Sequence, residues 1–293
     1  MHSLGKTIVG IFLAAVSASA VLAQGSSQAQ VSPPQVLQIT REFTKPGKGG
    51  PAHEKTESLF VSAMRRANFP AHYVAMTSMT GKSRALFFTS YASFEAWEND
   101  DAAVEKNPAL LSSLEHADAL DGDLLDSVDQ SVWLYNPGMS LRPVGDISHM
   151  RYMEISVYEV KPGHTREFLE GAKIVRDAYE KSDPSTHWAA FQLLYGGEGE
   201  AYVFLTSHKS LAEIDQSIAA QKGFMAAVGE DGMKHLDDLA AASIASYSNQ
   251  LFSFNAAMSY VPEEWIKSDP DFWKPKASAP AAKPAAAAEK PKQ

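Results

Sequence analysis

The chain has 293 residues, 45% of them hydrophobic and 21% charged, which is enough for two folded domains and excludes a disordered protein. It has no cysteine, which excludes disulfides, thiolate metal sites and a cysteine nucleophile. The formal net charge is −9. We expect no nucleic-acid partner, because an acidic surface repels phosphate backbones.

The N-terminus has the pattern of a secretory signal peptide. A short basic start precedes an apolar run over Ile8–Val16, and small residues precede a cleavage point near Ala23. Polar Ser17 ends this run before it reaches the roughly 20 residues of a membrane span, although an uncleaved anchor stays an alternative. We therefore expect a signal peptide over 1–23, a polar leader over 24–35, a periplasmic or secreted protein and no membrane span.

Two consecutive segments of the chain, called the first and second window below, each show a series of strand and helix patterns. Strands are predicted from period-two alternation, and helices from a 3.6-residue apolar period bounded by caps and prolines. The first window predicts strand 36–43, helix 51–68, strands 72–80 and 85–90, a helix capped by Ser93, helix 109–119 and strand 126–136. The second predicts strand 152–160, helix 165–181, strands 187–195 and 201–207, helices 210–218 and 231–245, and strand 246–255.

The end of each window carries the same motif. Ser131–Pro143 and Gln250–Pro262 match at a constant spacing, with identical pairs at Asn136/Asn255, Met139/Met258, Ser140/Ser259 and Pro143/Pro262. The turn Lys45-Pro46-Gly47 likewise returns as Lys161-Pro162-Gly163. Self-similarity of this kind indicates that one unit is written twice.

Each copy, 36–143 and 144–262, is predicted to be a β-α-β-β-α-β unit of the ferredoxin-like α+β class. Its four strands form an antiparallel sheet with both helices on one face, which leaves the other face bare. We expect the two bare faces to pack face to face, as an intramolecular dimeric α/β barrel. Residues 263–293, rich in proline, alanine and lysine, are expected to form a disordered tail.

This pattern resembles the dimeric α/β-barrel superfamily in its fused tandem form, most closely its NIPSNAP-type and antibiotic-biosynthesis-monooxygenase-type branches. The resemblance rests on the two Lys-Pro-Gly turns and on the hairpin–serine–helix joins at 90–97 and 207–214, and it covers 36–262. It implies the fold. For activity it implies alternatives, since the superfamily includes cofactor-free and haem-degrading monooxygenases, haem peroxidase-like enzymes, muconolactone isomerases and proteins without known activity.

Polar and aromatic side chains alternate with apolar ones on the first two strands of each copy. We expect this polar set, which includes Glu42, to face the space between the sheets and to line a small-molecule cavity. The alternative is an ordinary polar packing layer. The predicted ligand-binding residues are Gln38, Thr40, Tyr73 and Thr77 in the first copy and Ser156, Tyr158, Trp188 and Gln192 in the second.

Glu154 is the predicted catalytic residue. A carboxylate on a central strand, if enclosed between two sheets, would have a raised pKa and could act as a base. Gln38 stands at the matching position of the first copy, so this role would belong to one half only.

No metal ligand is predicted. His53 and Glu57 lie four apart on one helix, a spacing found in metal sites, but a solvated helical pair is the preferred interpretation. The acidic run over 118–129 does not match a calcium loop and is predicted to be a solvated turn.

No cofactor is predicted either, although haem stays an alternative. The resemblance implies a haem-ligating histidine on the late helix of a unit, where His116 and His235 fall. His72 and His187, at matching strand starts, are predicted to be capping or packing residues.

Taken together, we expect an exported protein that binds a small apolar or aromatic molecule between its two copies, as a monomer or homodimer. One alternative is a small monooxygenase or isomerase, cofactor-free or haem-dependent, acting in the same cavity. Another is a structural or partner-binding module that uses the sheet edges.

Overall fold

A computed structural model describes residues 32–274. The predicted signal peptide, most of the predicted leader and residues 275–293 lie outside the described residues. Between 32 and 274, every helix is too short or too polar to cross a membrane.

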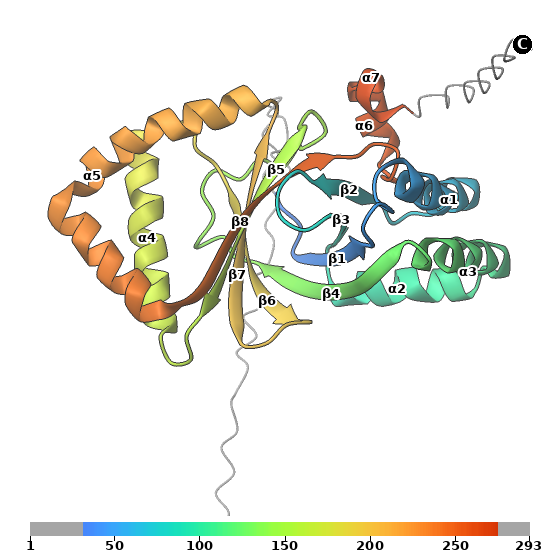
Figure 1. Ribbon diagram of the computed structural model, residues 1–293, viewed down its shortest axis with the longest axis horizontal. Coiled ribbons are helices and arrows are strands. Elements are labelled where there is room, and N and C mark those ends of the chain that lie inside the picture. Colours follow the sequence, from blue (N-terminus) through green and yellow to red (C-terminus); the bar gives the residue numbers. More distant parts are fainter. Residues whose placement is uncertain (1–31, 275–293) are drawn as a thin grey trace, which may run out of the picture. The chain divides into compact units, whose positions relative to one another are not determined.

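Eight antiparallel strands close into one barrel (Figure 1). They are β1 (Val36–Thr44), β2 (Tyr73–Ser78), β3 (Arg84–Tyr91), β4 (Leu125–Tyr135), β5 (Tyr152–Val160), β6 (Ala189–Tyr195), β7 (Glu200–His208) and β8 (Ile244–Phe254). Around the barrel the order is β1-β3-β2-β8-β5-β7-β6-β4, and β4 pairs again with β1. The predicted closed α+β barrel is confirmed.

The first four strands and the last four follow the same order. Read from β4 the first set is β4-β1-β3-β2, and read from β8 the second set is β8-β5-β7-β6. The sets meet at two seams, where β2 pairs with β8 and β4 pairs with β6.

The repeated motif of the sequence lies at these seams. The backbone N–H of Asn136 donates to the carbonyl oxygen of Ala190 (2.8 Å), and the Ala190 N–H donates to Ser140 Oγ (2.9 Å). The second copy of the motif, Asn255–Ser259, makes the same two bonds with Ala75. The motif therefore bonds the end of β4 or β8 to the strand across the seam, which satisfies backbone groups that would otherwise lack a partner.

Helices cover the outside of the barrel. They are α1 (Pro51–Ala67), α2 (Phe94–Glu105), α3 (Pro108–Gly122), α4 (Thr165–Ser182), α5 (Leu211–Ser243), α6 (Glu263–Ser268) and α7 (Pro270–Trp273). Figure 1 shows α1, α2 and α3 on the side of β1–β4, and α4 and α5 on the opposite side. The predicted cap is confirmed, since Ser93 Oγ accepts from the Ala96 N–H at 3.1 Å.

The long helix α5 is bent. Gly229 has φ 74° inside it, a left-handed conformation that favours glycine, and Figure 1 shows the two arms at an angle. The sequence predicted separate helices over 210–218 and 231–245, whereas the chain stays helical between them up to the bend.

Apolar side chains fill the barrel interior. One buried cluster unites Leu37 and Ile39 of β1 with Met76 of β2, Ile155 of β5 and Phe252 of β8. The interior of an eight-stranded barrel is just wide enough for side chains to fill it. The prediction that the polar set lines the space between the sheets was therefore wrong. The alternation is present, but the apolar set points inward and the polar set points to the helices.

The predicted boundary of the C-terminal tail was also wrong. Residues 263–268 and 270–273 are helical rather than disordered. Trp273 is 2% exposed, its indole N–H donates to the carbonyl oxygen of Ser148 (2.7 Å), and its ring lies edge-on to Phe254. The folded part of the chain thus extends at least to Trp273.

Candidate functional site

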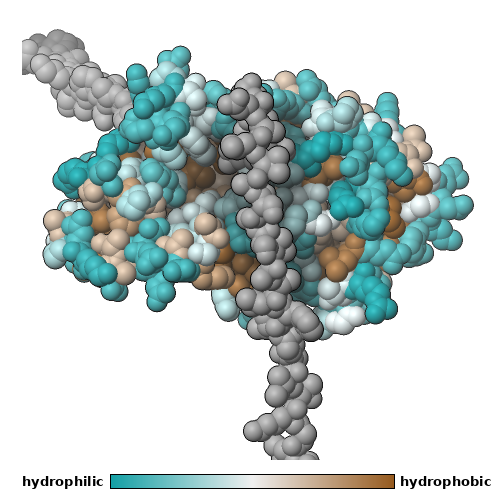
Figure 2. Space-filling view, turned by 180° about the vertical axis from the view of Figure 1, so that it is seen from behind, coloured by the Kyte–Doolittle hydropathy of each residue, from teal (hydrophilic) through white to brown (hydrophobic). Residues whose placement is uncertain are grey.

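A cavity of about 410 Å³ lies between the outer face of the neighbouring strands β5 and β7 and the helices α4 and α5. Its volume is within the range typical of small-molecule sites. The side chains that define it are Ser156, Tyr158, Phe168, Val175, Trp188, Phe204, Phe224 and Leu239. On the surface, hydrophobic residues also gather among hydrophilic ones on the side of α4 and α5, at the right of Figure 2.

The alternation of residues on β5 and the helical spacing of apolar residues on α4 place the side chains that line this cavity. On β5, Met153 and Ile155 point into the barrel, so the intervening residues Glu154, Ser156 and Tyr158 point to the helices. On α4, Phe168, Ala172, Val175 and Tyr179 recur every three or four residues and form an apolar stripe that faces the sheet.

Aromatic rings hold the walls in place. Trp188 lies edge-on to Tyr179, with ring centroids 5.9 Å apart, and Tyr179 stacks on Phe224 of α5 at 4.6 Å. The indole N–H of Trp188 donates to the carbonyl oxygen of Met139 (2.7 Å), which satisfies the one polar group of a nearly buried ring. Tyr158 lies 5.5 Å from Phe204, and burial raises the pKa of its hydroxyl well above the usual value.

A second hollow of about 560 Å³ adjoins the cavity and shares Trp188 and Thr206 with it. Glu154 and His208 line this hollow. The two spaces therefore form one region in which an apolar compartment opens beside a carboxylate.

Glu154 is ionised more readily than a free carboxyl. His208 Nε2 lies 3.6 Å from its Oε2, and the Asn249 side-chain amide donates to its Oε1 at 2.7 Å. These two neighbours lower the pKa of Glu154 and outweigh the opposing effect of burial. The predicted rise in this pKa was wrong, because the carboxylate lies outside the barrel among hydrogen-bond donors and not between two apolar sheets.

The structure brings only part of the predicted ligand-binding set together. Ser156, Tyr158 and Trp188 line the cavity, with Glu154 beside it. The remaining predicted residues do not line it. Gln38, Thr40, Tyr73 and Thr77 belong to the first four strands, and Gln192 is an exposed residue of β6. Whether any of these residues binds a ligand stays a prediction.

Several cavity residues were missed in the sequence. Phe168 and Val175 of α4, and Phe224 and Leu239 on the two arms of α5, supply most of the apolar wall. The spacing of the α4 residues carried a signal of an apolar face. The α5 residues carried none, because they come together only through the bend at Gly229.

A haem held by a histidine does not fit the apolar cavity, whereas the adjoining hollow is lined by His149, His187 and His208. No histidine of the described residues lines the cavity. His235 is about half exposed and lies 3.0 Å from Glu170 Oε1, and His116 is exposed. Beside the hollow, both ring nitrogens of His187 lie within hydrogen-bond distance of backbone carbonyls, which agrees with its predicted capping role.

No protein-family model matches the sequence, and no curated protein matches it either. Solved structures do show similarity. An anthrone oxidase-like protein has 14% identity and TM-score 0.49, with 75% of this chain and 92% of that chain covered. A protein provisionally named a monooxygenase, from Lactobacillus acidophilus NCFM, has 7% identity and TM-score 0.45, with 76% and 94% covered.

A third similar structure is a mutant chlorite dismutase from Candidatus Nitrospira defluvii, with 6% identity, TM-score 0.46, and 82% and 97% of the two chains covered. Similarity at this level assigns no chemistry to any side chain of this protein. The resemblance to the dimeric α/β-barrel superfamily agrees with the closed barrel that the chain itself forms.

Proposed function

We propose that the cavity between the strands β5 and β7 and the helices α4 and α5 binds a small apolar or aromatic molecule. The observation that carries the proposal is a space of about 410 Å³ with aromatic side chains on several walls. Ligand sites of this size are mostly apolar, with a few polar groups that orient the ligand. The ligand class is the one expected from the sequence, whereas the position moves from between the sheets to the helix side.

The polar groups at the cavity edge can orient a bound ligand. Ser156 and Thr206 offer hydroxyls at its edge, and Ser156 Oγ already donates to Asn249 Oδ1 at 3.3 Å. Glu167 and Asp237 also line the cavity, and the predicted base Glu154 lies in the adjoining hollow, where its lowered pKa makes it a weak base at neutral pH. A ligand with an apolar body and one polar substituent suits this arrangement.

The test is an isothermal titration of the purified chain with 1-naphthol, a small aromatic phenol. We expect one saturable site per chain. The variant Ala172→Trp places an indole in the cavity from α4 and should weaken binding more than about tenfold, equivalent to ~1.4 kcal/mol. Its fold is checked by circular dichroism.

The matched control is Ile218→Trp. Ile218 is 65% exposed on the same pair of helices and does not line the cavity, so this variant should bind 1-naphthol like the parent. Equal binding by the parent and Ala172→Trp would contradict the proposal. Oxygen uptake in the same titration would indicate an oxygenase acting in this cavity rather than a carrier.

We also propose that the protein is exported. The pattern of residues 1–23 supports export. Mass spectrometry of the protein from a cell fraction tests this, and a mature chain that begins at Gln24 is the expected result.

We further propose that the two halves of the chain arose by duplication. The matching strand orders and the repeated seam motif support this proposal. An experimental structure in which the two halves do not superpose strand on strand would contradict it.

A further inference from the structure

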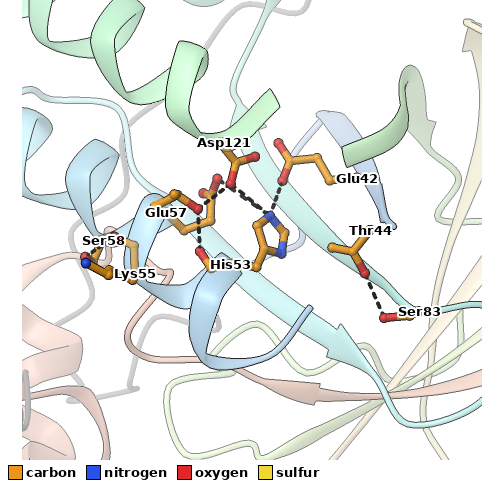
Figure 3. A network of polar contacts seen from close by, with 9 residues as sticks. Glu42, Thr44, His53, Lys55, Glu57, Ser58, Ser83 and Asp121 are labelled. Atoms are coloured by element: carbon orange, nitrogen blue, oxygen red, sulfur yellow. Dashed lines mark hydrogen bonds and ion pairs between the residues drawn. The ribbon is translucent and has the colours of Figure 1, made fainter. Parts of the chain in front are cut away.

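Four titratable side chains meet on the other helix-covered face of the barrel. Glu42 comes from β1, His53 and Glu57 from α1, and Asp121 from the last turn of α3 (Figure 3). His53 Nε2 lies 3.0 Å from Glu42 Oε2, 3.4 Å from Asp121 Oδ1 and 3.9 Å from Glu57 Oε1. One nitrogen or oxygen from each of the four lies within 4.8 Å of the others.

The cluster is buried, unlike an ordinary acidic surface patch. His53 and Glu57 are each 3% exposed and Asp121 is 2% exposed, so the predictions of a solvated helical pair and a solvated acidic turn were wrong at these residues. The spacing of four puts His53 and Glu57 on one face of α1. This face packs on β1 and α3, which supply the other two carboxylates.

The cluster has more hydrogen-bond acceptors than donors. Thr56 Oγ1 donates to Asp121 Oδ1 at 2.5 Å, but no lysine or arginine of residues 32–274 forms an ion pair with any of the four side chains. Glu57 Oε1 is buried and has no hydrogen-bond partner in this part of the chain. Buried carboxylate oxygens without a partner are rare in folded proteins, because their desolvation is costly.

The pKa shifts of Glu57 and His53 agree with a buried cluster that is rich in carboxyl groups. Burial, and then the charges of Glu42 and Asp121, raise the pKa of Glu57 to about 9. Burial lowers the pKa of His53, but hydrogen bonds to Asp121 and Glu42 outweigh it and raise this pKa to about 10. Three carboxyl groups thus surround one imidazole in a largely buried site.

We propose that His53 Nε2 and one carboxylate oxygen each of Glu42, Glu57 and Asp121 bind a divalent transition-metal cation, with Zn²⁺ as the best match. Zinc takes four nitrogen or oxygen ligands at ~2.0–2.2 Å, which places tetrahedral ligand atoms about 3.3–3.6 Å apart. The separations of 3.0 Å, 3.4 Å and 3.9 Å around His53 Nε2 lie within about 0.3 Å of this range. Imidazole favours zinc over magnesium or calcium.

The geometry points to a structural cation. All four ligands come from the protein, and structural zinc sites are closed in this way, whereas catalytic sites keep a position open for water. The ligands join β1, α1 and α3. The cation would therefore fasten both helices to the first four strands, and its binding would add to the stability of the fold.

The test uses the purified full chain after dialysis against a chelator. Isothermal titration with ZnCl₂ should give one site per chain, with tighter binding than MnCl₂. A hundredfold excess of Zn²⁺ over its Kd should raise Tm by roughly 5 to 10 °C. The variant Glu57→Gln removes one ligand charge with little change in shape. It should weaken Zn²⁺ binding more than about tenfold and remove the rise in Tm.

The matched control is Glu170→Gln. Glu170 also contacts a histidine, His235, at 3.0 Å, but both side chains are about half exposed and no further carboxylate between residues 32 and 274 joins them. This variant should bind Zn²⁺ like the parent. Circular dichroism checks that Glu57→Gln is folded. If it is not folded, Asp121→Asn replaces it, with the same expected loss.

Three results would overturn the proposal. The first is no Zn²⁺ binding by the parent, and the second is equal binding by the parent, Glu57→Gln and Glu170→Gln. Either would leave the four side chains as a buried ion-pair network held together by protons. The third is tighter binding of Mn²⁺ than of Zn²⁺, which would exclude the tetrahedral zinc assignment.

Discussion

Glu42 and Tyr158 occupy the same place on the two helix-covered faces of the barrel. Each lies three residues before the lysine of a Lys-Pro-Gly turn, on β1 and on β5, and each points to the helices. Glu42 meets the imidazole of His53, whereas the ring of Tyr158 lies 5.8 Å from the ring of Phe168. One face therefore encloses a charged cluster and the other an apolar cavity.

This difference indicates that the side-chain chemistry can vary in the spaces between the strands and the helices and not in the barrel interior. The barrel interior is packed with apolar side chains from both halves, and a polar replacement there would have no partner. The two spaces between strands and helices are separate from each other. Each can change its chemistry through a few side chains while the strand order and the seam motifs stay the same.

Removing His53 should have the largest effect. The variant His53→Ala leaves Glu42, Glu57 and Asp121 without their shared imidazole, and breaking a buried charge network in this way costs about 3–5 kcal/mol. The exposed contact of His235 with Glu170 on the other face provides the comparison. The variant His235→Ala should cost less than about 1 kcal/mol.

Urea denaturation of both variants measures this difference. If the free energy of unfolding fell by the same small amount in both variants, the prediction that the polar cluster stabilises the fold would be wrong.

Transplanting a carboxylate into the apolar face should have the next largest effect. The variant Tyr158→Glu places a charge among Phe168, Phe204 and Tyr247 without an imidazole to meet it, at a cost of about 2–3 kcal/mol. The variant Tyr158→Phe keeps the ring and should cost less than about 1 kcal/mol. Similar stabilities for the two variants in a thermal melt would mean that this face tolerates charge.

The smallest effect concerns the pH dependence of Glu154. Its pKa in the folded chain lies below the ordinary value of 4.5, so its contribution to stability is present above pH 4.5 and is lost as the pH falls through the folded-state pKa. The parent should be more stable than Glu154→Gln at pH 7, by less than about 1 kcal/mol because the pair is partly exposed, and the gap should close on acidification.

Denaturation at pH 7 and at pH 3 gives this difference. A gap that widens in acid would contradict the assigned direction of the pKa shift.

Much of the fold was predictable from local patterns. The alternation of Val36–Phe43, the proline at the start of α1 and the cap at Ser93 each depend on nearby residues, and the repeated motif predicted two matching halves. Alternation does not say which face of a strand points inward. Leu37 and Ile39 could have packed on helices or in a barrel, and the small interior of the closed barrel decides between them.

The sites were less predictable, because they join residues that lie far apart in the chain. The spacing of His53 and Glu57 was visible, but an exposed pair has the same spacing. Nothing local shows that Glu42 from β1 and Asp121 from α3 meet them. The cavity of the other face likewise depends on the bend at Gly229, which brings two arms of α5 over one sheet.

Native mass spectrometry of the full chain with Zn²⁺ and 1-naphthol together tests most directly the claim that the two faces are chemically separate. We predict that the parent carries both, that Glu57→Gln keeps 1-naphthol and loses Zn²⁺, and that Ala172→Trp keeps Zn²⁺ and loses 1-naphthol. Loss of both ligands in either folded variant, or of neither in both variants, would contradict the claim.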